Sequence, residues 1–528
     1  MDANNVASIG YFAPELILTG ALLMIVIADL LLRQKAILGH FALITSVAAL
    51  AAIFGTAGFP QGWIFSRMLI FDSFAIFFRA LIGLATVVAI WMSIGSEEVR
   101  NSEQGEYYTI LLASALGMFL MASAANLLMA YLSLEFVSLT SYILTGYLRH
   151  NRRSQEAALK YLIYGGVASG TMIYGMSWIY GLAGSIDFAV INHALSTSGP
   201  SATLAVFIAL VLILAGLGYK VSSVPFHMWA PDVYTGAPIP ITTFLAIGSK
   251  AAGFALLTRF FYPAISHLAP GDGTWTSLAG VDWPQLLLVI CMVTMTLGNF
   301  AALQQSNMKR LLAYSSIAQA GYALMGFVLL SNDGIRAMLF YLFAYYVMDA
   351  GAFLVVMMVA NRTKSEDISA YKGLAWRGGV VPAVALTIFL FSLTGIPLTV
   401  GFIGKFYLFA AVIRSRFYWL AVVGLLNSVV ALYYYVRPIR TMFLDQPDEG
   451  APVFSGEVWN YGLMGILVTA TIVFGLYWTP VLSLADRSLK FFTGSEFEQP
   501  LSGRGAADPA GSLSERHLAS SNDHSLAK

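Results

Sequence analysis

Apolar runs long enough to cross a lipid bilayer recur along the chain from about residue 11 to residue 484. A helix needs roughly 20 mostly apolar residues to cross the hydrocarbon core. Because 58% of the residues are hydrophobic and only 11% are charged, lipid is expected to surround most of the chain. The runs predict about fourteen transmembrane helices, near residues 11–33, 36–57, 74–95, 108–123, 125–148, 158–183, 203–222, 238–262, 283–303, 310–331, 335–360, 380–413, 418–443 and 459–484.

The distribution of Lys and Arg between alternate loops tests this topology independently. Cytoplasmic loops of membrane proteins carry an excess of both residues. One set of loops holds Arg33, Lys35, Arg100, Arg149, Arg152, Arg153, Lys309, Arg310, Arg362, Lys364, Lys372, Arg377, Arg437 and Arg440, and the other holds Arg67, Arg336, Arg414 and Arg416. This asymmetry places both chain ends on the non-cytoplasmic side. Since residues 1–5 lack the basic start of a cleaved signal, the first run is expected to remain a span.

Charge and cysteine content exclude several classes of function. A formal charge of +1 leaves no basic stripe for nucleic acid. Cys291 is the only cysteine, so disulfides, thiolate iron–sulfur ligation and Cys-based zinc sites are excluded within this chain. No nucleotide-binding glycine motif is present, so no NADH site is expected. Residues 494–528 are polar without periodicity and are predicted to be a disordered tail.

Two segments rich in proline and glycine interrupt the helical patterns in a related way. They are residues 220–240 and 392–405, with Lys220 at the start of the first and Lys405 at the end of the second. Interrupted spans at matching places in two halves indicate an internal repeat, and broken helices can bind ions or water within the membrane. The alternative is that both are kinks that fill packing space.

Five charged residues lie within or close to the predicted spans, namely Glu135, Lys160, Lys220, Lys250 and Lys405. A charge at the bilayer centre costs about 2.5–3.5 kcal/mol on insertion scales, so these side chains are expected to face the protein interior or water. Glu135 and Lys250 lie near the middle of their runs, far from either surface. Lys160 follows a basic loop and has the alternative of extending to the bilayer surface.

These residue types are suited to passing protons. Removal from water disfavours the charged form of lysine or glutamate and a neighbouring opposite charge restores it, so a moving Glu135–lysine pair could gate proton release. A permanent structural ion pair is the alternative. His227, Asp232 and Asp349 are accessory candidates. A lone histidine is usually a structural hydrogen-bonding residue, and no second histidine has ligand spacing to His227, so a metal is not expected there. Proton entry is the alternative role for His227.

Five segments resemble a known family: YLSLEFVSLTSYILTGY, RRSQEAALKYLIYGGVASGTMIYGMSWIYG, KVSSVPFHMWAPDVYTGAPIPITTFLAIGSKAAGF, NMKRLLAYSSIAQAGY and GIPLTVGFIGKFYLF. They are similar to the subunit N family of NADH-quinone oxidoreductases, the antiporter-like membrane subunits of bacterial complex I, over roughly residues 10–485. The resemblance implies an all-α membrane fold of fourteen helices with two inverted five-helix repeats, each containing a broken helix. The implied units are N-terminal helices at 1–107, repeats at 108–262 and 283–443, and a C-terminal helix at 459–484.

Carried over by position, the resemblance makes Glu135 a half-channel glutamate and Lys160 its paired lysine. Lys220 becomes the lysine of the first broken helix, Lys250 the central lysine, and Lys405 the lysine beside the second broken helix. The implied activity is proton translocation across the bacterial inner membrane, together with other membrane-arm subunits. NADH, FMN, iron–sulfur clusters and quinone are then bound by other subunits, and this chain holds no cofactor. The polar tail departs from the family pattern.

Three alternatives stay open. A subunit of a multi-subunit cation/proton antiporter would share the repeat and the buried lysines. The homologous subunit of photosynthetic complex I would serve electron transfer from ferredoxin to plastoquinone. A purely structural membrane subunit would tolerate neutral replacement of Glu135 and Lys250.

Overall fold

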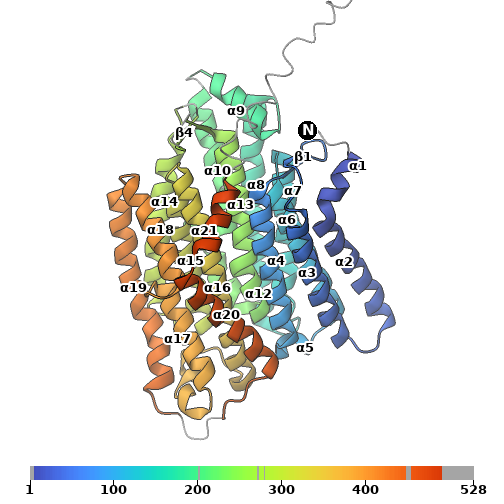
Figure 1. The fold of residues 1–528 in the computed structure, drawn as a ribbon, viewed down its shortest axis with the longest axis vertical. Coiled ribbons are helices and arrows are strands. Elements are labelled where there is room, and N and C mark those ends of the chain that lie inside the picture. The colour runs from blue at the N-terminus through green and yellow to red at the C-terminus, as the bar shows by residue number, and fades with distance from the viewer. Residues whose placement is uncertain (1–4, 200–201, 270–272, 279, 448–452, 490–528) are drawn as a thin grey trace, which may run out of the picture.

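The computed structural model describes residues 5–199, 202–269, 273–278, 280–447 and 453–489. These residues form a bundle of helices that run mostly side by side, with α2 and α3 at one edge and α19 at the other (Figure 1). The predicted all-α membrane fold is confirmed. The tail predicted at 494–528 lies outside the described residues.

The first half of the chain contains the helices from the N-terminus through the first break to α13. They are α1 (Asn5–Ser8), η1 (Ile9–Phe12), α2 (Ala13–Leu31), α3 (Ala36–Thr56), α4 (Ser73–Ile94), α5 (Glu97–Arg100), α6 (Gln104–Ser123), α7 (Leu127–Thr145), α8 (Arg152–Ala183), α9 (Phe188–Thr197), α10 (Thr203–Val221), α11 (Trp229–Gly236), α12 (Ile239–Phe244), the π-helical turn η3 (Leu245–Ser249) and α13 (Lys250–Ile265).

The second half continues with α14 (Trp283–Ala302), α15 (Met308–Phe327), α16 (Asn332–Thr363), η4 (Ile368–Tyr371), η5 (Leu374–Arg377), α17 (Val380–Thr394), α18 (Val400–Arg414), α19 (Tyr418–Phe443), α20 (Val458–Leu476) and α21 (Thr479–Ser488). Two short antiparallel hairpins, which the sequence patterns did not predict, pair β1 (Gly62–Ile64) with β2 (Leu69–Phe71) and β3 (Ser266–Leu268) with β4 (Trp275–Ser277).

Among the described residues, eleven helices are long and apolar enough to cross a membrane. The other predicted spans fall on α8, α15 and the pair α17–α18. Tyrosine, glycine, serine and charged residues lower the hydropathy of α8 and α15, while α17 and α18 have only 15 residues each. The count of fourteen and the division into repeats therefore stay predictions.

Both predicted interruptions are present. The first follows α10, where Ser222 adopts a left-handed conformation (φ 62°) and the short helix α11 precedes α12. The second separates α17 from α18, and Gly395 there has φ 96°, which glycine adopts without the steric penalty of a Cβ atom. A Cβ at Gly395 would also lie only 3.0 Å from Cδ of Lys405.

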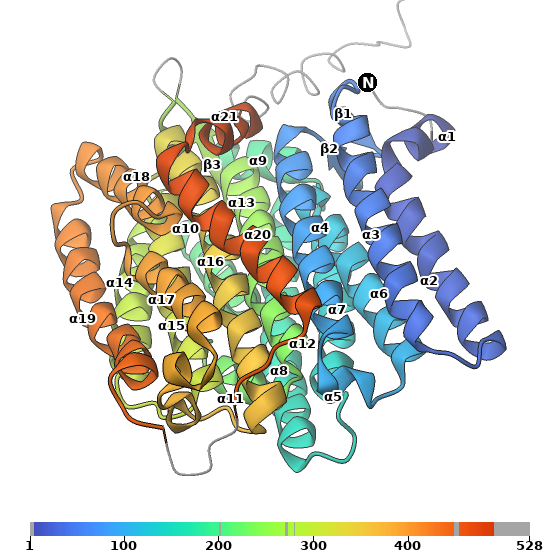
Figure 2. The same ribbon diagram turned by 60° about the horizontal axis from the view of Figure 1, so that its bottom comes forward.

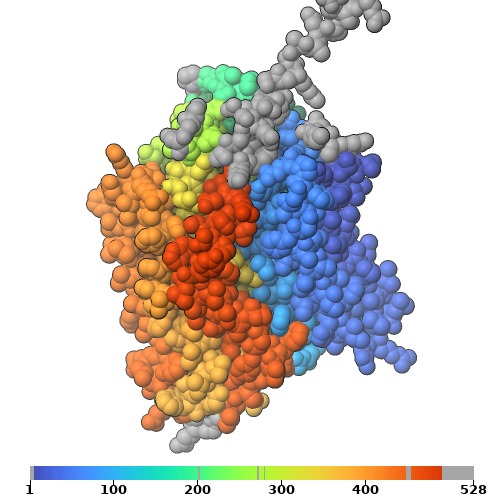
Figure 3. Space-filling model, in the orientation of Figure 1, coloured from blue at the N-terminus to red at the C-terminus, as the bar shows by residue number. Residues whose placement is uncertain are grey.

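The segment after the first break and the helix α16 lie in the middle of the bundle. The apolar window of the segment Ile239–Ile265 is entirely buried, and that of α16 is 94% buried, whereas those of the span ending with α2 and of α3, α19 and α20 are at most 33% buried. On the outside, α20 lies across the face where the N-terminal and C-terminal helices meet (Figures 2 and 3). The centre of the bundle is therefore screened from lipid on all sides by other helices.

Candidate functional site

Three lysines are buried in the middle of the bundle, each beside a departure from regular α-helix. Lys220 lies in the last turn of α10 before the first break, Lys250 follows the π turn η3, and Lys405 lies in α18 after the second break. Their exposed fractions are between 2% and 4%, so none of them faces lipid. Such burial requires a polar environment, because an isolated charge in hydrocarbon is costly.

The central lysine is held by α15. Lys250 Nζ donates to the Ser316 carbonyl oxygen at 2.6 Å and also to the Ser316 hydroxyl. The Tyr345 hydroxyl lies 2.7 Å from Ser316 Oγ and 3.0 Å from Asp349 Oδ2. Asp349, whose partner could not be identified from the sequence, is thus linked to Lys250 through a serine and a tyrosine.

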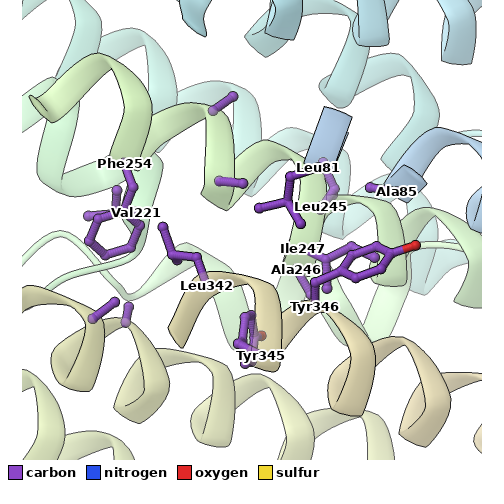
Figure 4. Close-up of a cluster of buried hydrophobic side chains, with 14 of the residues drawn as sticks. Leu81, Ala85, Val221, Leu245, Ala246, Ile247, Phe254, Leu342, Tyr345 and Tyr346 are labelled. Carbon is purple, nitrogen blue, oxygen red and sulfur yellow. The ribbon is translucent and has the colours of Figure 1, made fainter. Parts of the chain in front are cut away.

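The π turn that precedes Lys250 is fixed by apolar packing. Figure 4 shows Leu245 of this turn beside Leu81 and Ala85 of α4. A Cβ at Gly248 would lie 3.3 Å from the Ala85 Cβ, so the small residue permits this close approach. Widened π turns occur often at functional sites because they redirect one side chain within a helix.

Lys220 and Glu135 form no direct ion pair with each other among the described residues. Glu135 lies on α7 and Lys220 lies at the end of α10. Neither Lys220 Nζ nor Glu135 Oε1 has a hydrogen-bond partner within this part of the chain. Gly253 of α13 admits Lys220, since a Cβ there would lie 3.2 Å from Lys220 Cγ.

Lys160 lies elsewhere, in a charged cluster at the edge of the bundle. Its Nζ is 2.7 Å from both Glu156 Oε1 and Asp232 Oδ2, and Arg310 Nη2 lies 3.3 Å from Asp232 Oδ1. These two carboxylates hold the Lys160 ammonium group, and among the described residues Lys160 forms no direct ion pair with Glu135. The relay roles that the resemblance implied for Glu135 and Lys160 stay predictions.

This cluster borders a cavity of about 410 Å³ where α8, α11 and the start of α15 meet. The cavity is lined by side chains of both signs, including Arg153, Glu156, Asp232, Arg310 and Asp367. A partly open site with this lining favours water and ions over apolar ligands. It opens beside α11, the short helix of the first break.

Lys405 is held without a carboxylate among the described residues. Its Nζ donates to the Thr394 carbonyl oxygen at 2.9 Å and lies 3.4 Å from Ser428 Oγ. The ammonium group also lies 4.4 Å from the centre of the Tyr322 ring, and the Tyr322 hydroxyl is 2.9 Å from Ser428 Oγ. Neutral groups therefore surround this lysine.

Polar side chains on α15 fill the space between the central and the second-break lysines. Gln319, which is 2% exposed, donates to the Leu393 carbonyl oxygen and to the Tyr435 hydroxyl, each at 3.2 Å, and accepts from the Tyr341 hydroxyl. Ser316 and Tyr322 stand on either side of Gln319 along the helix. One helix thus contacts both Lys250 and Lys405.

His227 and possible metal ligands stand apart from this network. His227 lies in the bend between α10 and α11, and its Nδ1 has no hydrogen-bond partner among the described residues. The same residues contain no group of three or more His, Cys, Asp or Glu side chains that could hold a metal ion. A proton-entry role for His227 stays a prediction.

The sequence of the central region decides the family. Residues 124–431, more than half of the chain, match the family described as "NADH:quinone oxidoreductase/Mrp antiporter, TM". The chain belongs to this family. The matched residues include all the lysines of the central network, Glu135, Asp349 and both helix breaks.

Individual members of this NADH:quinone oxidoreductase/Mrp antiporter family agree with that assignment. A protein of Anaeromyxobacter sp. (strain Fw109-5), named "NADH-quinone oxidoreductase subunit N", is 45% identical over 512 residues, covering 93% of this chain and 98% of the relative. The resemblance to the subunit N family is thereby confirmed.

Solved structures confirm the fold. A chain of respiratory complex I from Thermus thermophilus with bound aureothin superposes with a TM-score of 0.74 at 30% identity, covering 90% of this chain and 99% of that one. A chain of the Mrp complex from Dietzia sp. DQ12-45-1b superposes with a TM-score of 0.79 at 19% identity, covering 92% of this chain and 98% of that one. The second likeness, at such low identity, is one of fold alone.

Sequence reasoning missed several buried polar residues of this family member. The sequence did indicate Arg79 and Arg259, since both are charged residues inside predicted spans and are therefore expected to be buried with partners. Ser316, Gln319 and Tyr345 gave no such signal, because hydroxyl and amide groups are tolerated in membrane helices when they find partners on neighbouring helices.

Proposed function

We propose that this chain is a proton-translocating membrane subunit of a complex I, in which other subunits transfer electrons from NADH to quinone. The observation that carries the proposal is the row of buried lysines at helix irregularities, with Lys250 and Lys405 both contacting α15. Intramembrane ionisable groups that face a bundle interior mark ion or proton pathways. No redox chemistry is assigned to this chain.

The proposed order of roles follows the contacts. Glu135 on α7 is proposed to influence the charge of Lys220, which lies just before the first break, and Lys250 exchanges its proton with the network of Ser316, Tyr345 and Asp349. Lysine suits this task because its ammonium group can lose a proton when water is removed, whereas arginine stays charged.

The remaining predicted residues are proposed to act at the two ends of the proton path through Lys220 and Lys250. Asp232, the partner of Lys160, lines the charged cavity, which serves as the approach for protons from the basic, cytoplasmic side. Lys405, surrounded by neutral groups, is the lysine nearest the second break and passes the proton on. His227 is a second candidate for proton entry.

The relatives support the proposed partners and location. Because the Anaeromyxobacter relative is named as subunit N of NADH-quinone oxidoreductase and the Thermus chain comes from respiratory complex I, this chain is proposed to assemble with other membrane-arm subunits. FMN, iron–sulfur clusters and quinone would be held by those partners. The proposed location is the bacterial inner membrane, with both chain ends on the non-cytoplasmic side.

The test is the variant Lys250→Met in the assembled complex. It removes the ammonium group while keeping a long side chain, so proton pumping in sealed inside-out vesicles is expected to fall, while NADH oxidation with an artificial acceptor of the peripheral arm stays unchanged. Unchanged pumping by assembled Lys250→Met complex would contradict the proposal. A purely structural subunit predicts that outcome.

A cation/proton antiporter subunit is the second candidate, favoured by the shared family and by the likeness in fold to the Mrp chain. Purified protein in liposomes that exchanges sodium or potassium for protons would support it. Identification of the electron-input subunits that co-purify with the chain distinguishes an NADH-driven complex from a ferredoxin-driven photosynthetic one.

A further inference from the structure

The start of α15 holds the short helix α11 at both ends. Near the beginning of α11, Arg310 Nη2 lies 3.3 Å from Asp232 Oδ1. Directly after its end, Lys309 Nζ donates to the Ala237 carbonyl oxygen at 2.8 Å. Two consecutive basic residues of α15 therefore contact the two ends of the helix that forms the first break.

Lys309 is buried although the sequence placed it in a basic loop. Its side chain is 2% exposed, and its Nζ lies 2.8 Å from Glu366 Oε1. Glu366 is itself tied to the start of α15, since its carbonyl oxygen accepts from the Met308 amide at 2.8 Å and Oε2 lies 3.3 Å from Asn307 Nδ2. A lysine needed only to orient the protein in the bilayer would remain exposed, so this burial indicates a more specific task.

The short helix α11 packs against the part of α16 that carries Asp349. Tyr234 lies in the middle of α11, and its buried ring lies 6.4 Å, between ring centres, from the ring of Phe353, one turn after Asp349. On its other side α11 packs closely on α8, because a Cβ at Gly236 would lie 2.4 Å from the Ala157 Cβ. A small displacement of α11 would therefore disturb the packing beside Asp349, which Tyr345 and Ser316 link to Lys250.

We propose that Lys309 is a positioning residue that fixes α11 between the charged cavity and the Lys250 network. The expected effect on proton pumping rests on the proposed function, whereas the role of Lys309 in holding α11 does not depend on it. The ammonium group of Lys309 holds the end of α11 by the Ala237 carbonyl, while Glu366 holds the ammonium group in place. Lys309 itself receives no proton in this scheme.

The first measurement reads the position of α11 without using activity. Thr235 lies on α11 in the cavity lining, and Cys291, the only native cysteine of the chain, is buried. In assembled complex carrying Thr235→Cys, the rate of labelling by a membrane-impermeant maleimide is followed by mass spectrometry of this chain. Addition of Lys309→Met is expected to change that rate severalfold, and an unchanged rate would overturn the proposal.

The matched control is Lys364→Met, which removes an exposed lysine from the same set of basic loops and should leave labelling and pumping unchanged. If Lys364→Met changed the labelling rate as much as Lys309→Met, the proposal would be overturned, because removing any basic loop residue would then have the same effect. If Lys309→Met complex does not assemble, Glu366→Gln is tested instead. It should shift the labelling rate in the same direction, and no shift in assembled complex would overturn the proposal.

The second measurement is proton pumping in sealed vesicles, with Lys250→Met measured in parallel. Lys309→Met is expected to lower the protons moved per NADH severalfold, and Lys309→Arg, which keeps the charge, is expected to restore part of the loss. If Lys250→Met lowers pumping and Lys309→Met changes neither pumping nor labelling, this inference fails while the proposed function stands. If Lys250→Met leaves pumping intact, the proposed function fails, and the labelling rate alone decides whether Lys309 holds α11.

Discussion

The molecule buries charge in two different ways in two neighbouring regions. Where α4 meets α2 and α13, arginines pair directly with carboxylates: Arg79 Nη2 lies 2.9 Å from Glu15 Oε1, and Arg259 Nη1 lies 2.6 Å from Asp72 Oδ2. In the central network, Lys250 and Lys405 are instead held by carbonyl oxygens, hydroxyls and aromatic rings.

The chemistry of the two cations explains the difference. Arginine does not lose its proton in proteins, and its planar fork matches a carboxylate, so an arginine pair gives a fixed contact. Lysine that lacks a contacting carboxylate can change its protonation state with its hydration. The arginine pairs are therefore suited to holding helices together, and the lysines to exchanging protons.

The largest effect is expected at the arginine pair between α13 and α4. Arg259→Ala leaves the Asp72 carboxylate buried without its partner, which should destabilise the protein by about 3–5 kcal/mol. The amount of assembled complex and the thermal unfolding midpoint of the purified complex measure this loss. Any complex that does assemble should still pump protons in normal proportion to electrons.

A double variant tests whether the pair is only structural. Asp72 also accepts a hydrogen bond from the Ala75 amide at the start of α4, which asparagine can replace. Asp72→Asn with Arg259→Met should recover much of the lost stability, because removing both charges avoids an unpaired one. Normal stability of Arg259→Ala alone would remove the distinction between the two regions.

The next effect is expected in function rather than in stability. Lys250→Arg keeps a positive charge beside Ser316 but cannot release its proton. Proton transfer through this position should slow on the order of 10²-fold or more, the usual contribution of a positioned acid–base group. Assembly should stay close to normal, and pumping per NADH in sealed vesicles measures the loss. Normal pumping by Lys250→Arg would show that Lys250 serves as a fixed charge, like the arginines.

Much of the fold could be predicted because the bilayer limits the choices. Apolar run lengths located the helices, and the two segments rich in proline and glycine marked the interruptions after Lys220 and before Lys405. The π turn at Leu245–Ser249 gave no signal, since its residues pack equally well in a regular helix. The two hairpins were also missed because each strand has only three residues.

The site was predictable only in its residue types. Charges inside apolar runs indicated Lys250 and Lys405, but partners in space come from other helices and leave no pattern in the sequence. The ion-pair partner of Lys160 is an example, because Asp232, which holds Lys160, lies on α11 across the first break. From the sequence, Lys309 was counted only among the basic loop residues that orient the chain in the bilayer. A basic residue at the start of a helix has the same sequence pattern whether its side chain is exposed or buried.

The smallest effect is expected where an ion pair is exposed. Lys364, at the end of α16, pairs with Glu97 of α5, and 68% of its side-chain surface is accessible. Because water already solvates both charges, Lys364→Met should change the stability of the complex by less than about 1 kcal/mol. The thermal midpoint should move little, and added salt should bring variant and parent closer together because it screens exposed charges. A loss comparable to that of Arg259→Ala would mean that burial does not decide the strength of these pairs, and the comparison between paired arginines and unpaired lysines would lose its basis.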